Sequence, residues 1–177
     1  MKQVLLIVAA ALAVTACASV PAPATKPWPE ARPYQVSDTA SADVDAALAR
    51  ARQSDKRVLL VMGANWCSDS RALAGWLATD RFVDLIQRKY ELVYVDIGMA
   101  GPDRPNVGIA RRFGVAGLPG SPNVLVLTRD GVLVNPTTAT TWRNAETRSA
   151  DAIYAELATL ADLPVSPGDS HGPGDGD

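Results

Sequence analysis

The chain between residues 41 and 162 predicts an α/β domain, and three features carry that prediction. Residues 58–62 form an apolar run, as expected of a strand that is covered on both faces. A sharp break at Gly63, Ala64 and Asn65 follows, after which the hydrophobic spacing becomes helical. Strand and helix patterns then alternate at close spacing, which favours a parallel strand pair with a right-handed crossover.

The first helix is expected over residues 41–53. Ser41 is a good N-cap, and Val44, Leu48 and Ala51 recur on one face. This spacing predicts an amphipathic helix that leads into the apolar strand.

The middle of the chain continues the pattern. Leu73, Trp76 and Leu77 share one face of the helix after the break, and we expect Trp76 in the core. The other expected elements here are a helix over 82–89, a strand over 91–97, a loop over 98–106 and a short helix over 107–113 that Gly114 ends.

A strand over residues 123–127 comes next. Arg129-Asp130-Gly131 is a hairpin signal, so we expect residues 132–134 to pair back as an antiparallel strand. Trp142 is the one large apolar residue of the polar stretch 135–147, and its indole is expected to pack over the sheet edge.

The last helix is expected to begin at the cap residue Ser149. Its apolar stripe consists of Ile153, Tyr154, Leu157 and Leu160.

The N-terminus predicts a targeting segment over residues 1–16, with Lys2 before an apolar run that is short for a membrane span. The run ends in Val-Thr-Ala-Cys17, which resembles a bacterial lipobox. That resemblance implies a lipid on Cys17 and a membrane-anchored envelope protein that faces the periplasm. Ala18 is not the aspartate of an inner-membrane retention signal, so the outer membrane is favoured. The alternative is an ordinary secretory signal cleaved near Ala16 or Ala18, which would leave Cys17 a free thiol.

The rest of the domain organisation follows from composition. Residues 17–40 contain five prolines after Cys17 and read as an extended linker, in which docking of Trp28 and Tyr34 onto the domain is left open. The domain spans 41–162, and a Gly, Pro and Asp tail spans 163–177.

Cys67 follows Trp66 where the strand gives way to the helix. Backbone N–H groups at a helix start are unpaired and carry partial positive charge. They stabilise a thiolate more than a thiol, so a cysteine there is more reactive than usual. The sequence therefore predicts a thiol site with Cys67 as the reacting residue and Trp66 at its rim.

The segment from Trp66 to Arg71 resembles the active-site segment of the thioredoxin superfamily, which reads Trp-Cys-x-x-Cys after a buried strand. It is more similar to a bacterial subgroup of thioredoxin family proteins that has Trp-Cys-x-Asp-Ser-Arg there. The resemblance covers roughly residues 41–160. It implies a three-layer α/β/α sandwich with a central mixed β-sheet.

Two departures from the family pattern bear on activity. Ser70 stands where a dithiol thioredoxin has its second cysteine, and Val61 stands where it has a buried, proton-handling aspartate. We expect Ser70 to support Cys67 by donating a hydrogen bond to its sulfur. Asp69 opposes a second negative charge nearby, and Arg71 partly offsets it.

Thioredoxins have a cis-proline that faces the active cysteine. The resemblance implies a cis bond between Ser121 and Pro122, because the strand at 123–127 follows with the family spacing. Pro119 is the competing candidate. With Trp66, Ser121 and Pro122 would then bind the substrate chain.

Composition excludes several function classes. A net charge of −2 argues against a nucleic-acid surface. The lone His171 in the tail is a poor metal site, since zinc takes about four ligands. We expect no metal, no cofactor and a monomer.

Two main hypotheses remain. Cys67 acts as a monothiol oxidoreductase on a protein thiol or disulfide partner of the envelope, or the domain is a non-enzymatic binding module for such a partner. A peroxide sensor and a merely structural buried cysteine are the lesser alternatives.

Overall fold

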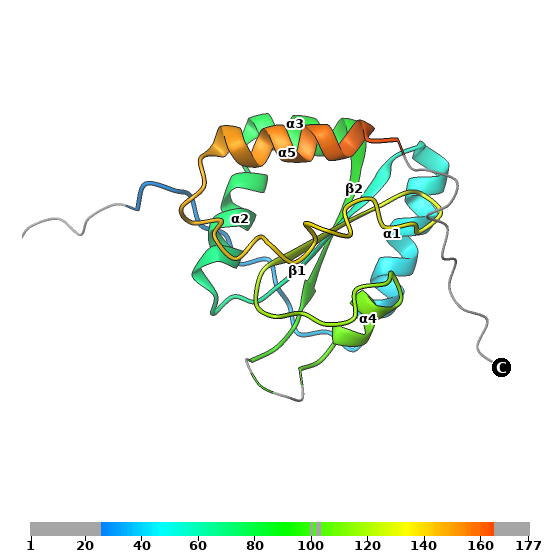
Figure 1. The fold of residues 1–177 in the computed structure, drawn as a ribbon, viewed down its shortest axis with the longest axis horizontal. Helices are drawn as coiled ribbons and strands as arrows, with labels where there is room; N and C mark the ends of the chain where they lie inside the picture. The colour runs from blue at the N-terminus through cyan, green and yellow to red at the C-terminus, as the bar shows by residue number, and fades with distance from the viewer. Residues whose placement is uncertain (1–25, 100, 102–103, 165–177) are drawn as a thin grey trace, which may run out of the picture.

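The computed structural model describes residues 26–99, 101 and 104–164 (Figure 1). The predicted signal segment, the lipidation site Cys17 and His171 lie outside the described residues, so the expectations for them remain predictions. Within the described ranges, no helix is long and apolar enough to cross a bilayer.

Five helices and three strands are assigned in the described residues, and the strands form one mixed sheet in the order β2-β1-β3. β1 pairs in parallel with β2 and antiparallel with β3, with Leu60 opposite Val93 and Leu125. The elements are α1 (Ala40–Ser54), β1 (Arg57–Gly63), α2 (Ser68–Leu77), α3 (Asp80–Lys89), β2 (Tyr90–Asp96), α4 (Val107–Arg111), β3 (Asn123–Leu127) and α5 (Ala150–Asp162).

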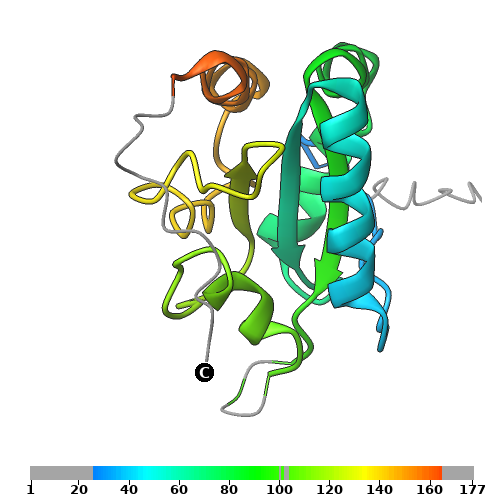
Figure 2. The same cartoon turned by 90° about the vertical axis from the view of Figure 1, so that its right-hand side faces the viewer.

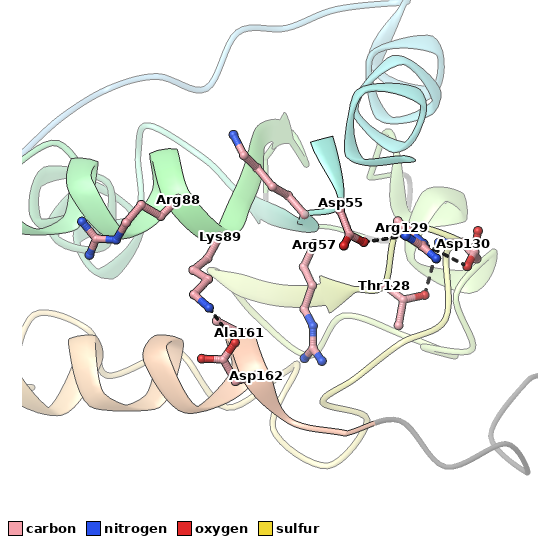
Figure 3. Close-up of a pocket in the computed structure, with 10 residues that line it drawn as sticks. Asp55, Arg57, Arg88, Lys89, Thr128, Arg129, Asp130, Ala161 and Asp162 are labelled. Atoms are coloured by element: carbon pink, nitrogen blue, oxygen red, sulfur yellow. Dashed lines mark hydrogen bonds and ion pairs between the residues drawn. The ribbon is translucent and has the colours of Figure 1, made fainter. Parts of the chain in front are cut away.

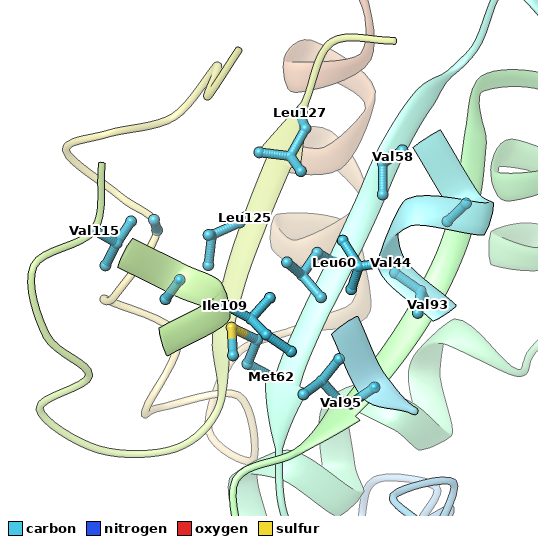
Figure 4. Packing of buried hydrophobic residues seen from close by; sticks show 14 of the residues in the cluster. Val44, Val58, Leu60, Met62, Val93, Val95, Ile109, Val115, Leu125 and Leu127 are labelled. Carbon is cyan, nitrogen blue, oxygen red and sulfur yellow. The ribbon is translucent and has the colours of Figure 1, made fainter. Parts of the chain in front are cut away.

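Helices cover both faces of this sheet, so the predicted three-layer sandwich is confirmed (Figures 1 and 2). Successive side chains of a strand point to opposite faces. Val58, Leu60 and Met62 pack with α1 and α4 (Figure 4). Leu59 and Val61 pack on the other face with α2, α3 and α5. Because β1 is buried on both faces, its sequence is apolar without alternation.

The start of α1 differs from the prediction. Thr39, not Ser41, is the N-cap residue, and the helix begins at Ala40. The Thr39 hydroxyl donates to the Asp43 carboxylate. Ser41 lies within the first turn, where its hydroxyl accepts a hydrogen bond from Arg112. At the other end of the domain, the predicted cap of α5 is confirmed, since Ser149 Oγ accepts from the N–H of Ala152.

The chain after β3 also differs from the prediction. Instead of a strand over 132–134, one isolated bridge joins Leu127 to Leu133. The antiparallel return itself is present, because the N–H of Thr128 donates to the carbonyl of Val132 and the N–H of Val134 donates to the carbonyl of Val126, each at 2.8 Å. Beyond Val134, a side chain continues the pairing. Asn135 accepts from the N–H of Val126 and donates to the carbonyl of Val124, both at 2.9 Å.

Trp142 and Trp76 pack against the same core cluster but are buried to different depths. Trp142, expected over the sheet edge, is fully buried beside α5, with the Arg148 guanidinium over its ring. Trp76, expected in the core, is only half-buried against the same cluster. Single-turn spacing shows which side of a helix a residue occupies, but not how deeply that side is covered.

The sequence left open whether the N-terminal stretch docks onto the domain, and it does. Tyr34 is 2% exposed and joins the core cluster of α2, α3 and α5. Its ring packs edge-on against Tyr94 of β2 with the centroids 5.4 Å apart. The part of the expected linker before Lys26 lies outside the described residues.

Candidate thiol site

Cys67 lies at the junction of β1 and α2. Its N–H donates to the carbonyl of Ala64, which closes the turn after the strand. Its own backbone is extended (φ −82°, ψ 125°) and it is the N-cap residue of α2. The side chain is half-buried, and Cys67 is the free cysteine of the part of the chain that the structure describes. The local sequence brings this about, because a small-residue turn separates a buried strand from an amphipathic helix.

A loop from the other half of the domain meets this cysteine. Cys67 Sγ donates to the carbonyl oxygen of Ser121 at 3.2 Å, across 54 positions of sequence. The peptide bond between Ser121 and Pro122 is cis, as predicted, and Pro119 is not the cis-proline. β3, which pairs with β1, starts at the next residue and so brings the loop to the thiol.

Ser70 contributes differently from the prediction. Its hydroxyl is fully buried and forms a 2.7 Å hydrogen bond with the hydroxyl of Ser121, instead of the expected bond to the sulfur of Cys67. It also accepts from the N–H of Ala64 at 3.4 Å. Ser70 therefore holds the loop whose carbonyl receives the thiol.

Trp66 is at the rim of the site, with 45% of its surface exposed. Its indole N–H donates to the carbonyl of Gly98 at 2.8 Å. Gly98 in turn donates its N–H to the buried carboxylate of Asp96. Sequence analysis missed Asp96, whose only signal is an acid at the end of an apolar strand.

The charges expected to act on Cys67 are engaged with backbone groups. Asp69 accepts from the N–H of Glu146 at 2.9 Å, and burial raises the pKa of its carboxyl. Arg71 donates to the carbonyls of Asn65 and Trp66. The two side chains thus hold the loops around the thiol.

Val61 is fully buried among apolar side chains, so its position offers no proton-handling group. In the described residues, no group of three or more histidine, cysteine or acidic side chains is placed to hold a metal ion. The chemistry available at this site is that of a thiol.

A charged cleft of about 410 Å³ lies at the other end of β1, beside Arg57 (Figure 3). Its cations are largely matched by acids, as in the ion pairs of Lys89 with Asp162 and of Arg129 with Asp55. The cleft is lined by charged side chains and contains no cysteine.

The comparisons with known proteins agree with this geometry. A family model described as thioredoxin-like matches residues 39–128, just over half of the chain. The chain therefore belongs to the thioredoxin-like family.

Two similar proteins have names that refer to thiol–disulfide chemistry. The chain is 36% identical over 81 residues to Thiol:disulfide interchange protein DsbD 1 of Pseudomonas aeruginosa, which is 46% of this chain and 13% of that protein. The chain thus spans a small part of that relative. It also resembles the crystal structure of a disulphide isomerase from Xylella fastidiosa Temecula1, with a TM-score of 0.67 and 32% identity over 75% of this chain and 98% of the other.

Proposed function

We propose that this protein is a monothiol thiol–disulfide oxidoreductase that acts through Cys67. The observation that carries the proposal is the Cys67 thiol at a helix start, facing the carbonyl that precedes a cis-proline. The names of the two relatives, an interchange protein and a disulphide isomerase, support it.

The reaction is an exchange of sulfur partners. The Cys67 thiol loses its proton to solvent, and the thiolate attacks one sulfur of a substrate disulfide. The new S–S bond joins Cys67 to the substrate, the old S–S bond breaks, and the other substrate sulfur leaves as a thiolate that takes up a proton. A second thiol, from the substrate or from a small molecule, attacks the mixed disulfide and frees Cys67.

The neighbouring residues suit this task. Trp66 offers an exposed ring, and Ser121 and Pro122 offer an edge along which a substrate chain lies next to the sulfur. Ser70 supports that edge through its bond to Ser121. Because Ser70 is not a thiol, the mixed disulfide has no internal route of release.

We infer that the protein works in the bacterial envelope, held to a membrane by a lipid on Cys17. The lipobox-like end of the apolar N-terminal run supports this, and the outer membrane is favoured by Ala18. The periplasm is kept oxidising, so disulfide partners are available there.

A binding module is the second candidate. The valine at position 61 and the serine at position 70 favour it, because both replace groups that serve dithiol exchange. In that case, the surface around Trp66 and Pro122 would recognise an envelope protein without reacting.

Trapping on Cys67 separates the two candidates. The full-length chain is incubated with a peptide dimer joined by one disulfide, quenched with acid and digested with trypsin. We expect one peptide's mass on the fragment 58–71, removed by dithiothreitol and absent in Cys67→Ser. In the same digest, a lipid on Cys17 would add its mass to the N-terminal fragment.

The opposite result is equally clear. The fragment 58–71 would then stay unmodified, and Cys67→Ala would capture the same envelope partners as the wild type. These two results would favour the binding module over the oxidoreductase.

A further inference from the structure

The segment 29–34 lies against the thiol site although it precedes the residues that match the family model. The N–H of Ala31 donates to the carbonyl of Arg71 in α2 at 3.1 Å. The side chain of Asn65 pairs with both backbone groups of Tyr34, donating to its carbonyl at 2.7 Å and accepting from its N–H at 3.3 Å. The segment therefore contacts both the turn before Cys67 and the helix after it.

Arg71 completes these contacts from the helix side. Its side chain is 13% exposed, and Nη1 donates to the carbonyls of Asn65 and Trp66, each at 3.0 Å. Its Nε lies 3.4 Å from the carboxylate of Glu30. Arg32 donates to the Asn65 carbonyl as well. The two carbonyls that immediately precede Cys67 are thus held by charged donors.

The fit is close enough to exclude a methyl group at two glycines. A Cβ on Gly75 would lie 2.2 Å from the carbonyl oxygen of Pro29, and one on Gly63 would lie 2.6 Å from the ring of Tyr34. Real Cβ atoms essentially never lie closer than 3.0 Å to such a neighbour. Glycine at position 75 therefore lets the segment lie directly on α2.

We propose that residues 29–34 and Arg71 form a clamp that positions the sulfur of Cys67 for disulfide exchange. Arg71 is a positioning residue, since it touches the backbone of Asn65 and Trp66 and not the sulfur. Held in this way, the turn keeps Cys67 against the carbonyl of Ser121, beside which the substrate disulfide must lie. The inference rests on the proposed oxidoreductase function for its catalytic consequence, but its structural part can be tested without it.

Two rate constants separate positioning from stability. The first is the rate constant for exchange of Cys67 with the disulfide-linked peptide dimer, and the second is the rate constant for alkylation of Cys67 by iodoacetamide. Both are measured on the full-length chain by mass spectrometry of the fragment that carries Cys67. A small reagent tolerates many orientations of the sulfur, whereas in-line attack on a disulfide does not. Measurements are made at a temperature where circular dichroism shows every variant folded.

We expect Arg71→Met to lower the exchange rate about tenfold and to change alkylation by less than about twofold. Arg71→Lys, which keeps a charged donor for both carbonyls, should recover most of the loss. The matched control is Arg57→Met, because Arg57 also donates to two backbone carbonyls, those of Leu160 and Leu163, but at the far end of β1 (Figure 3). It should leave both rates unchanged.

Gly75→Ala is the second variant. Alanine is the better helix former, so it strengthens α2 as a helix while it forces residue 29 away. We expect slower disulfide exchange while the alkylation rate of Cys67 changes by less than about twofold, as in Arg71→Met. A role in stability alone would not produce this split.

Two outcomes would overturn the clamp. Either exchange and alkylation change by the same factor in Arg71→Met, or Arg57→Met behaves like Arg71→Met. If the wild type itself does not react with the peptide disulfide, the proposed function is wrong. The structural part of the clamp proposal is then tested by amide hydrogen exchange. The amide of Cys67, which donates to the carbonyl of Ala64, should then exchange faster in Arg71→Met and not in Arg57→Met. Equal rates in the two variants would refute the clamp.

Discussion

Cys67, Ser70 and Ser121 form one hydrogen-bonded group in which each residue has a separate task. Cys67 presents the thiol, Ser121 receives its hydrogen bond through the backbone carbonyl, and Ser70 holds Ser121 through the hydroxyl groups. Ser70 occupies the place of a resolving thiol in the dithiol pattern, but its partner is the loop and not the sulfur. In the proposed exchange reaction, this group would receive a substrate disulfide but would supply no second thiol to release it.

Ser70→Cys tests this at the residue scale. Cys67 is the N-cap residue of α2, and position 70 lies three residues further on, which is the spacing of the two cysteines in the dithiol thioredoxin pattern. We therefore expect two cysteines at these positions to form a disulfide. We expect oxidation to remove two hydrogens from the fragment containing both residues. We also expect the mixed disulfide between Cys67 and one peptide to become short-lived, because the new thiol displaces the bound peptide.

Ser70→Ala is the matched control. It supplies no thiol and leaves the hydroxyl of Ser121, a residue that is 6% exposed, without its partner. Its free energy of unfolding should fall by about 1–3 kcal/mol, while its mixed disulfide stays long-lived. If Ser70→Cys kept two free thiols after oxidation, the assignment of this position would be wrong.

At the scale of elements, β3 is supported by a side chain on its outer edge. The irregular chain after the turn at Gly131 returns toward β3 but forms only one bridge with it. Asn135, which is 3% exposed, takes the place of a strand residue by bonding to Val124 and Val126. β3 begins directly after Pro122, so this support also bears on the loop at the thiol.

Asn135→Ala should therefore destabilise the fold strongly. It leaves the carbonyl of Val124 and the N–H of Val126 without partners in the core, at a cost of about 1–3 kcal/mol for each buried group. We expect the free energy of unfolding in urea to fall by about 2–6 kcal/mol. Asn144→Ala, an exposed position in the same stretch, should stay within about 0.5 kcal/mol of the wild type. Equal values for the two variants would contradict the role of Asn135.

At the scale of the whole molecule, all four tyrosines are packed into or against one core cluster, and three of them have a raised pKa. Burial raises the pKa of Tyr34, Tyr90 and Tyr94 above the ordinary value. Tyr90 also donates to the carbonyl of Leu157, which ties β2 to α5. The folded state therefore keeps these phenol protons at pH values where the unfolded chain loses them.

The molecule should lose stability as the pH rises above about 10, the ordinary tyrosine value. In that range the unfolded chain binds fewer protons than the folded state, so the free energy of unfolding falls with pH. Each such tyrosine contributes about 1.4 kcal/mol per pH unit. The free energy of unfolding in urea, measured from about pH 8 to about pH 11.5, checks this, because the range extends to both sides of the ordinary tyrosine pKa of about 10.

Tyr94→Phe removes one of these titrating groups and is the control for the alkaline effect. Its slope above about pH 10 should be shallower than that of the wild type by about 1.4 kcal/mol per pH unit. A wild-type free energy of unfolding that stays flat across this range would show that the tyrosines ionise without unfolding the domain.

The sequence by itself determined the elements and the position of the thiol. An uninterrupted apolar run, a turn of small residues and a helical pattern are local signals, and together they predict that Cys67 begins a helix after a buried strand. Resemblance to the thioredoxin superfamily added the cis bond before Pro122, and the geometry agrees. The strand, the turn, the helix and the cis bond can each be recognised from a few neighbouring residues or from a shared motif.

Only the tertiary structure decided the partners of these residues. The carbonyl that meets Cys67 is 54 positions away, the hydroxyl that meets Ser70 is 51 positions away, and Tyr34 reaches Asn65 across 31 positions. In the same way, the side chain of Asn135 bonds to Val126 and Val124 across 9 and 11 positions. A hydrogen bond forms over about 3 Å, so its partner depends on how distant segments of the chain pack, which local spacing does not specify.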